Sequence, residues 1–551
     1  MRIAPIALGF SSVGLILCAQ DSSTIRVTTR LVQLNVIARD QNGPVSDLKK
    51  EDFSIFEKGK KRQIASFSMT SASGLSVVPA GMQMPPNAFS NRLNRSAAAP
   101  STLTVILIDA LNTALLDQKM AVDSTIKVLE SLKPEDPVAV YILGTRGLQV
   151  LHDFTSDFDQ LRAALRQTKG ESSGLLRAST EQPVARGVGA WTFAGQNEQV
   201  ATVAVMERAR RTTDSLTAIA QHISVIPGRK NLLWVSGSFP VGVGSNLEVR
   251  ALSNALPSRL GSPPISPAPL TIEMQIRQTP PPPSGLQEPQ LFTDELRKSW
   301  RALNDANVAV YPVDARGLLA LPSGVTPGID TMLLIADQTG GRAYFNNSDL
   351  TGAMRSAMDD GRVSYTLGFY VPAADLDGKF HDIKVRVGRS GVELGHRAGY
   401  WAIEELQRSD GQIEEDLRTA AARPLEITEL GVSARGDMLP GNDPGLRVAV
   451  SIDLSDARFE KKDDRWIGKL ELFLFQLGAD GARLDATSAV LPLNLTDKSF
   501  QRAAREGMLV SKTLKPAPGA QEVRVLVFDR GSGKIGSLRM PMGPILAAAK
   551  K

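Results

Sequence analysis

The chain has 551 residues, which at roughly 150 residues per domain predicts three or four domains. Apolar residues make up 42% and charged residues 22% of it, both ordinary for globular protein, and the net charge is only +5. The sequence has no block of about five like charges and no basic face interleaved with aromatic residues, so we expect no nucleic-acid partner.

Residues 1–20 have the layout of an export signal: Arg2 is followed by an apolar run over 3–17 and then by a polar segment. The run is short for a membrane span. Cys18, the single cysteine, is a candidate for lipidation, although Leu17 stands where such signals carry a small residue. We therefore expect a secreted, periplasmic or cell-envelope protein, with a lipid anchor at Cys18 as its only membrane contact.

The segment 24–70 predicts part of a β-sandwich. Apolar and polar residues alternate over 25–38 before turn residues at 40–44, which indicates a hairpin, and two further short strands are expected at 53–56 and 64–67. So few strands are marginal alone and should pair with strands from elsewhere. Residues 71–100, rich in Ser, Pro, Asn and Ala, predict a linker.

Residues 101–362 alternate buried strands with helices, which is typical of a doubly wound, mostly parallel sheet. The strands are expected at 103–109, 138–143, 231–235 and 308–313, with a short one at 342–345. The helices are expected at 115–132, 157–165, 200–226, 291–307 and 332–339. Two inserts, 168–195 and 257–289, are too rich in Gly, Ser, Arg or Pro to form a packed core.

The alternating pattern of strands returns after this unit. Strands over 363–402 are expected to pair with those of 24–70, so that the α/β unit is inserted in, or flanked by, one sandwich. A helix at 403–423 then links to residues 425–540, whose short strands and turns predict a second β-sandwich. The apolar segment 470–475 should be a covered central strand, because an exposed edge of this composition would aggregate. The predicted fold class is α/β plus all-β.

An ordered set of segments resembles the von Willebrand factor A-related proteins of acidobacteria. The set comprises VIARDQNGPV at 36–45, DFSIFE at 52–57, DALNT at 109–113, NLLWVSG at 231–237, YTLGFY at 365–370, FHDIKVRV at 380–387 and RAGYW at 397–401. The resemblance covers roughly residues 24–402. It implies an exported protein with an A-type domain, and it specifies architecture better than activity.

The resemblance also implies a metal-ion-dependent adhesion site, whose first motif is Asp-x-Ser-x-Ser after the first strand. Asp109 matches this motif and Thr113 keeps a hydroxyl, but Leu111 replaces an oxygen ligand. Ser236 stands where the fourth strand is usually followed by Asp. The family's site is therefore damaged, because Mg²⁺ needs about six oxygens and favours carboxylates.

A rearranged site is one interpretation of these residues. With the strand order 3-2-1-4-5-6, Asp314 should lie near the loops of Asp109 and Ser236. These residues, with Thr113 and a carbonyl of Asn112, would then hold Mg²⁺, Mn²⁺ or Ca²⁺. The other interpretation is that Asp109 and Asp314 only accept hydrogen bonds from turn amides, and that no cofactor binds.

No catalytic motif stands out, and the four histidines lack metal-binding spacing. His222 is expected on a helix face as a packed or solvated residue. The preferred function is a non-enzymatic adhesion, scaffold or protein-binding role that uses the carboxyl-end face of the central sheet, with a protein ligand. The alternative is a metal-assisted hydrolase that uses the Asp109 and Asp314 cluster.

Overall fold

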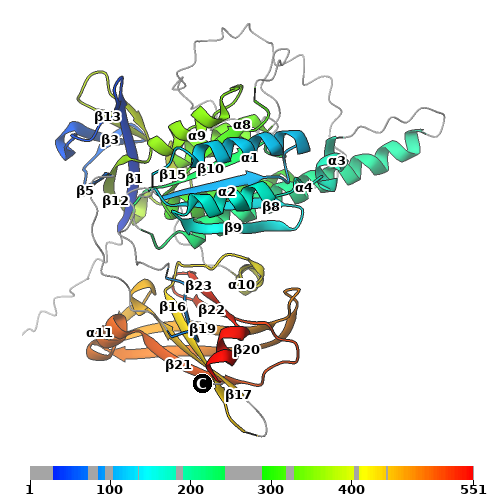
Figure 1. Cartoon of the computed structure of the whole chain (residues 1–551). Helices are drawn as coiled ribbons and strands as arrows, with labels where there is room; N and C mark the ends of the chain where they lie inside the picture. Colours follow the sequence, from blue (N-terminus) through cyan, green and yellow to red (C-terminus); the bar gives the residue numbers. More distant parts are fainter. Residues whose placement is uncertain are drawn as a thin grey trace, which may run out of the picture.

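A computed structural model describes the chain over ten segments. These are residues 29–71, 85–92, 103–133, 136–180, 190–226, 228–241, 288–317, 328–402, 409–441 and 445–549. The predicted signal with Cys18, residues 257–287 of the predicted insert and most of the predicted linker 71–100 lie outside them, whereas 288–289, the end of that insert, already belong to a helix. The chain combines a mixed α/β part with several antiparallel sheets, and Figure 1 shows the C-terminal sheets below the rest.

Five strands form the central sheet, in the order β11-β10-β7-β8-β9. They are β7 (Leu103–Asp109), β8 (Val138–Gly144), β9 (Gly147–Thr155), β10 (Lys230–Ser236) and β11 (Val308–Asp314). Every residue of β7, β10 and β11 is buried, as expected for apolar strands covered on both faces. In chain order the arrangement is 3-2-1-4-5, which agrees with the predicted order. The edge strand β9 runs antiparallel to β8 and was not predicted.

Helices cover both faces of this sheet (Figure 1). One face packs against α1 (Leu115–Leu129), α2 (Phe158–Gln167) and α9 (Leu350–Asp359). The other packs against α4 (Ala190–His222), α7 (Glu288–Asp305) and α8 (Ile329–Thr339). The helix α8 ends where Gly340 adopts a left-handed conformation, which glycine adopts readily at the end of a helix.

Two predictions for this unit were wrong. The insert 168–195 contains the helix α3 (Gly174–Thr180) and the beginning of α4, and Leu175 packs on the core. Its leucines and alanines outweigh the glycines that suggested a loop. Residues 342–345 form no strand, only one bridge between Val313 and Tyr344, because the chain leaves the sheet edge after a single contact.

Strands on either side of the α/β unit pair with one another. The first sheet contains β1 (Thr29–Asp40), β2 (Gly43–Pro44), β5 (Ser66–Ser71), β12 (Val363–Pro372) and β14 (Glu393–Gly395). The second contains β3 (Phe53–Glu57), β4 (Lys60–Arg62), β13 (Phe380–Val387) and β15 (Gly399–Trp401). The short helices η1 (Lys50–Asp52) and η3 (Ala373–Asp375) flank them. Both sheets share one hydrophobic core, and β12 lies between β1 and β5, so the predicted pairing of these segments is present.

The C-terminal part also has two sheets on one core. One contains β16 (Val432–Leu439), β17 (Gly445–Ile452) and β21 (Met508–Leu514). The other contains β18 (Glu460–Lys462), β19 (Arg465–Leu477), β20 (Arg483–Thr496), β22 (Glu522–Asp529) and β23 (Ile535–Pro541). The helices are η4 (Leu454–Asp456), α11 (Asp497–Glu506) and α12 (Met542–Ala548). As predicted, the apolar part of β19 is central, between β20 and β22.

The predicted linker 71–100 is not only a linker. Its residues Ala88–Ser90 form β6, which pairs with β16 of the C-terminal sheet. Next to it, the buried Asn91 amide donates to the carbonyls of Ile427 and Leu430, both at 2.8 Å, and accepts from Val432 N at 2.8 Å. The segment between the N-terminal sheets and the α/β unit is thereby attached to the C-terminal part.

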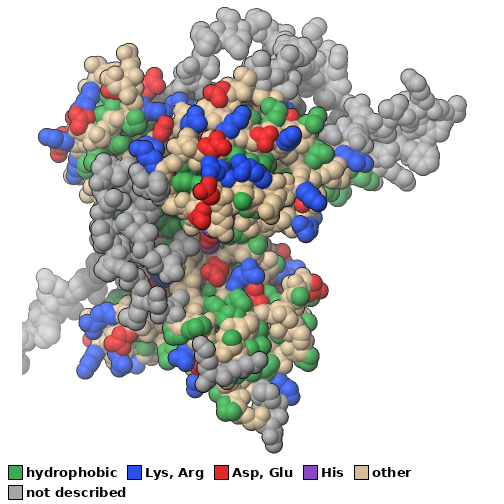
Figure 2. Space-filling model, viewed as in Figure 1, with side chains coloured by type: hydrophobic (Ala, Val, Ile, Leu, Met, Phe, Trp, Pro, Cys, Tyr) green, Lys and Arg blue, Asp and Glu red, His purple; other side chains and the backbone are tan. Residues whose placement is uncertain are grey.

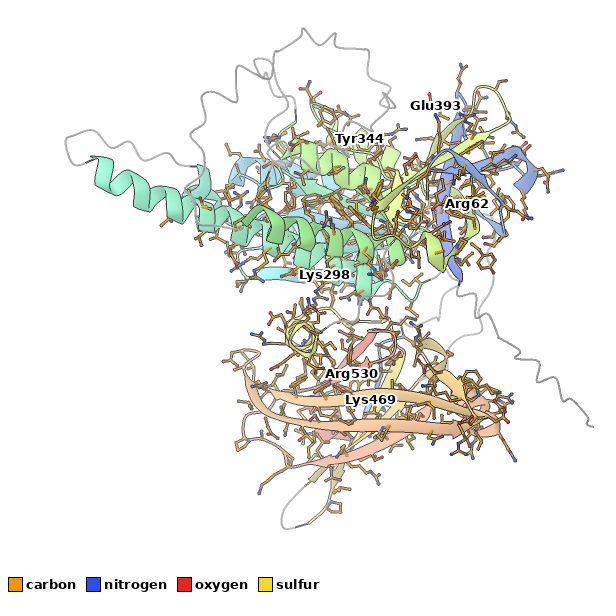
Figure 3. The ribbon with its side chains drawn as sticks, turned by 180° about the vertical axis from the view of Figure 1, so that it is seen from behind. Arg62, Lys298, Tyr344, Glu393, Lys469 and Arg530 are labelled. Carbon is orange, nitrogen blue, oxygen red and sulfur yellow. The ribbon has the colours of Figure 1, made fainter. Side chains whose placement is uncertain are left out.

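The α/β unit contacts the C-terminal part directly. The linker helix α10 (Asp410–Ala422) begins at a Ser409 cap, later than predicted, and residues 403–408 lie outside the described chain. Lys298 of α7, labelled at the border in Figure 3, pairs with Asp416 of α10. Thr428 N donates to Gln221 O at 3.1 Å. Within the described residues, no helix is long and apolar enough to cross a membrane.

Candidate functional site

The carboxylate of Asp109, at the carboxyl end of β7, is fully buried and surrounded by hydrogen-bond donors. Its Oδ1 accepts from Asn112 N at 3.0 Å. Its Oδ2 lies 2.8 Å from Asn112 Nδ2, 3.1 Å from Trp234 Nε1 and 2.9 Å from Ser236 Oγ. Burial raises the pKa of Asp109, and these hydrogen bonds offset part of the rise.

Asn112 connects this carboxylate to a buried arginine. Arg208 of α4 is 3% exposed, and its Nε donates to Asn112 Oδ1 at 2.9 Å. Asn112 Nδ2 also donates to Thr212 Oγ1, one helical turn further along α4, at 2.8 Å. Burial lowers the pKa of Arg208, whereas the charge of Asp109 raises it. Arg208 thus provides a positive charge beside Asp109 without a metal ion.

Thr113 and the loop after β10 lie against each other. Gly237 N donates to Thr113 Oγ1 at 2.8 Å. A Cβ atom at position 237 would lie 2.9 Å from Asn112 O, too close for the present backbone, so glycine permits this approach. The hydroxyl of Thr113 therefore fixes a loop.

Asp314 lies at the same edge of the sheet, one strand beyond Ser236. Its Oδ1 accepts from Arg316 N at 3.0 Å, and both of its oxygens lie 2.9 Å from the Arg316 guanidinium. The prediction that both aspartates end at one edge is correct. Their side chains belong to separate hydrogen-bonding groups, however, because Ser236 lies between them and Arg316 binds Asp314.

These residues do not fit a divalent cation as they stand. The structure brings Asp109, Asn112, Thr113 and Ser236 together, but their oxygens already face N–H or O–H donors, and Asn112 Oδ1 faces Arg208. A hard cation needs free oxygen lone pairs and would be repelled by the guanidinium. Across the described segments, no group of three or more His, Cys, Asp or Glu residues could hold a metal ion.

An exposed apolar cluster lies beside this buried network, at the beginning of α1. Leu116 is 82% exposed, Leu115 53% and Met120 45%. Met120 Cε lies 4.0 Å from where a Cβ of Gly317 would stand, so the cluster adjoins the loop of Asp314 and Arg316. We call Leu115, Leu116 and Met120 the α1 rim.

Three residues of this network, Arg208, Thr212 and Trp234, were not predicted as site residues from the sequence. Arg208 and Thr212 are about a hundred residues from Asp109 along the chain, and no motif connects them. A signal nevertheless exists: Ala204, Arg208, Thr212 and Leu216 follow one another at four-residue spacing, and all four are buried. An arginine on the buried stripe of a helix requires a buried acceptor.

Of the histidines, His222 is packed rather than solvated. It is 4% exposed, its Nδ1 lies 2.8 Å from Glu426 O, and its Nε2 lies 3.2 Å from Asp153 Oδ2. Asp153 also accepts from the Tyr141 hydroxyl at 2.8 Å. His222 thus connects α4 and β9 to the segment that enters the C-terminal part.

No protein-family model matches the chain, and no curated protein matches it. Among solved structures, the chain is similar to the crystal structure of the SpRpn10 VWA domain, at 14% sequence identity and a TM-score of 0.14. That match covers 24% of this chain and 75% of the other. The likeness to an A-type domain is weak.

Proposed function

We propose that this is an exported, non-enzymatic adhesion, scaffold or protein-binding protein. Its α/β unit acts as an A-type domain inserted in a β-sandwich, and its protein ligand binds at the carboxyl-end face of the central sheet. The export signal at 1–20 supports a secreted, periplasmic or cell-envelope location, with lipidation of Cys18 as the route to a membrane.

The observation that carries this proposal is the α1 rim. Three large apolar side chains lie exposed within the first two turns of α1, and clusters of this kind mark protein interfaces. On the face drawn in Figure 2, acidic and basic side chains are interspersed, which favours a protein ligand over nucleic acid. Leu116 and Met120 are four residues apart, so they present one surface to a partner.

The Asp109 network gives this surface a fixed support. The donors of this network hold the loop from which α1 begins. Arg208 supplies the positive charge near Asp109 that a bound cation would otherwise supply. We therefore propose that the ligand binds without a divalent ion. The alternative, a metal-assisted hydrolase, has less support because Asp109 is fully buried and Asp314 is paired with Arg316.

The substitution Leu116→Asp is expected to weaken ligand binding at least about tenfold while leaving the fold intact, because it places a charge in the centre of an apolar contact. The measurement is affinity capture from the native envelope fraction, with and without EDTA, followed by titration of the captured protein.

Val490→Asp on β20 is the matched control, since Val490 is 57% exposed and lies in the C-terminal part. It should bind like the wild type. Equal capture by L116D and wild type, or capture that EDTA abolishes, would count against the proposal.

A further inference from the structure

A small cavity lies where the strand β1 meets the α/β unit, at the amino ends of β10 and β11. Gln33 and Asn35 line it from β1, while Arg229, just before β10, and Val308, the first residue of β11, line it from the α/β unit. Its volume is about 10 Å³, which is enough for one particle of the size of a water molecule. The cavity is at the opposite edge of the sheet from Asp109, so it is separate from the proposed protein-binding face.

Arg229 is a buried cation whose hydrogen-bond acceptors are neutral. It is 3% exposed, and its Nη2 donates to the Tyr311 hydroxyl at 2.9 Å and to Gly340 O at 2.6 Å. Within the described part of the chain, its Nε has no hydrogen-bond partner and no carboxylate forms an ion pair with it. A guanidinium stays charged in proteins, and a buried charge is normally paired. Arg229 therefore lacks a direct counter-charge.

The carboxylate of Asp360 interacts with this guanidinium at longer range, but other arginines share it. Asp360 is 2% exposed and forms an ion pair with Arg39. Burial raises the pKa of Asp360, whereas the charge of Arg39 and then those of Arg342 and Arg229 lower it. One carboxylate thus serves three guanidinium groups, so it compensates the charge of Arg229 only in part.

The described wall of the cavity adds further donors and contains no Asp or Glu. A second arginine, Arg397, lines it and donates from Nη2 to Gln33 O at 2.8 Å. Asn35 Oδ1 accepts from the Thr366 hydroxyl at 2.9 Å, which leaves the amide group of Asn35 as a donor. A particle in the cavity therefore lies among two guanidinium groups and an amide donor, which are the groups that bind anions in proteins.

We propose that this cavity binds a single chloride ion, which pairs with Arg229 and joins β1 to the α/β unit. A monatomic anion accepts hydrogen bonds from every direction, so it suits donors that come from several elements. Phosphate, sulfate and carboxylate ligands are too large for the cavity. A water molecule could accept from Arg229 Nε, but it would leave the charge of the guanidinium uncompensated.

The test is the melting temperature of the full chain in sodium chloride and in sodium gluconate at equal ionic strength, since gluconate is too large for the cavity. An ion that binds only the folded chain stabilises it, so chloride should raise the melting temperature above the gluconate value by at least about 2 °C, and this difference should saturate. Arg229→Met should abolish the difference between the two salts. Arg355→Met, at an exposed arginine of α9, is the matched control and should keep it.

A second variant, Asn35→Asp, places a carboxylate at the cavity while one of its oxygens still accepts from Thr366. It should melt higher than the wild type in gluconate and gain nothing from chloride, because the carboxylate supplies the missing counter-charge. Asn35 is only half-buried, so N35D decides even if R229M fails to fold. The proposal is overturned if the wild type melts at the same temperature in both salts, if R229M keeps the difference, or if N35D responds to chloride like the wild type. Those outcomes would mean that the cavity holds only water.

Discussion

The substitution Arg208→Met is expected to destabilise the α/β unit by about 1–3 kcal/mol, the usual cost of leaving a buried acceptor, here Asn112 Oδ1, without its donor. Methionine matches the length of the arginine stem but cannot donate to Asn112 Oδ1. The carboxylate of Asp109 would also lose the favourable charge interaction with Arg208. Differential scanning calorimetry of the full chain measures the effect.

A double-mutant cycle between Arg208 and Asp109 distinguishes the loss of an electrostatic interaction from a simple loss of packing. Asp109→Asn should also destabilise, because its amide would oppose the donors from Asn112 and Trp234. The double variant should cost less than the sum of the single variants, since it removes both charges. Arg210→Met is the matched control, because Arg210 lies on the same helix with half of its side chain exposed. Strict additivity, or an equal loss in R210M, would refute the coupling.

The substitution Arg208→Met also tests whether the guanidinium of Arg208 takes the place of a cation. Titration of the wild type with Mg²⁺, Mn²⁺ or Ca²⁺ is expected to give no heat, because every donor around Asp109 would have to be displaced first. Removing Arg208 frees Asn112 Oδ1 and takes away the guanidinium that repels a cation, so R208M should bind these ions better than the wild type. Binding by the wild type that is lost in D109N would restore the cation site inferred from the sequence.

The central sheet could be predicted because its strands are buried on both faces. A strand such as β7, with seven buried residues, must be apolar throughout, and its turn residues then mark the carboxyl end. The edge strand β9 could not be predicted in this way, because its residues are only partly buried and its sequence has no apolar run. The helix α9 was missed for a related reason, since it is short and buries small residues such as Ala353 and Ala357.

The candidate site could be predicted only in part. Asp109, Asn112, Thr113 and Ser236 follow strand ends, and a parallel sheet brings such positions to one edge. Their partners depend on α4, whose register against the sheet is set by tertiary packing over the whole unit. The sequence placed Asp109 and Asp314 near each other, but it could not exclude a shared ion, because the pairing of Asp314 with Arg316 depends on a local turn.

The strand β6 illustrates the same limit. Three residues in a segment rich in Ser, Pro and Asn have no strand signal of their own. They pair with β16 because Asn91 satisfies three backbone groups of the C-terminal part, more than three hundred residues away in sequence. Long-range hydrogen bonds of this kind produce no recognisable pattern in the local amino-acid sequence.

The contact at His222, which joins α4 and β9 to the segment that enters the C-terminal part, is expected to lose stability as the pH rises. Nδ1 faces the carbonyl of Glu426 and Nε2 faces the carboxylate of Asp153, and both of these oxygens only accept hydrogen bonds. Both ring nitrogens must therefore carry protons, so the doubly protonated imidazolium fits this site and either neutral tautomer leaves one contact unpaired. The other titratable groups around His222 are the Glu426 carboxyl, whose charge also favours the imidazolium, Tyr141, which donates to Asp153, and Arg539, whose backbone N–H donates to the Glu426 side chain.

The sign of the pH dependence follows from these contacts. Burial opposes the charge on His222, but Asp153 and the Glu426 carbonyl outweigh it and raise the pKa of His222, while His222 in turn lowers the pKa of Asp153. A raised pKa means that the stabilisation is complete below about pH 6.5, the unfolded value, and is lost as the pH rises through the folded value. Because Asp153 is 41% exposed, solvent screens the pair and reduces the effect.

The measurement is the melting temperature from pH 5.5 to 9 for the wild type and His222→Phe. The difference between them should be largest at low pH and shrink as the pH rises, which isolates His222 from the other histidines. Asp153→Asn should move the loss to lower pH, because it removes the charge that stabilises the imidazolium. His152→Gln, at the residue next to Asp153, should keep the profile of the wild type. A constant difference between H222F and the wild type across this range would mean that His222 contributes only packing, and that the two parts of the chain are joined without a titrating contact.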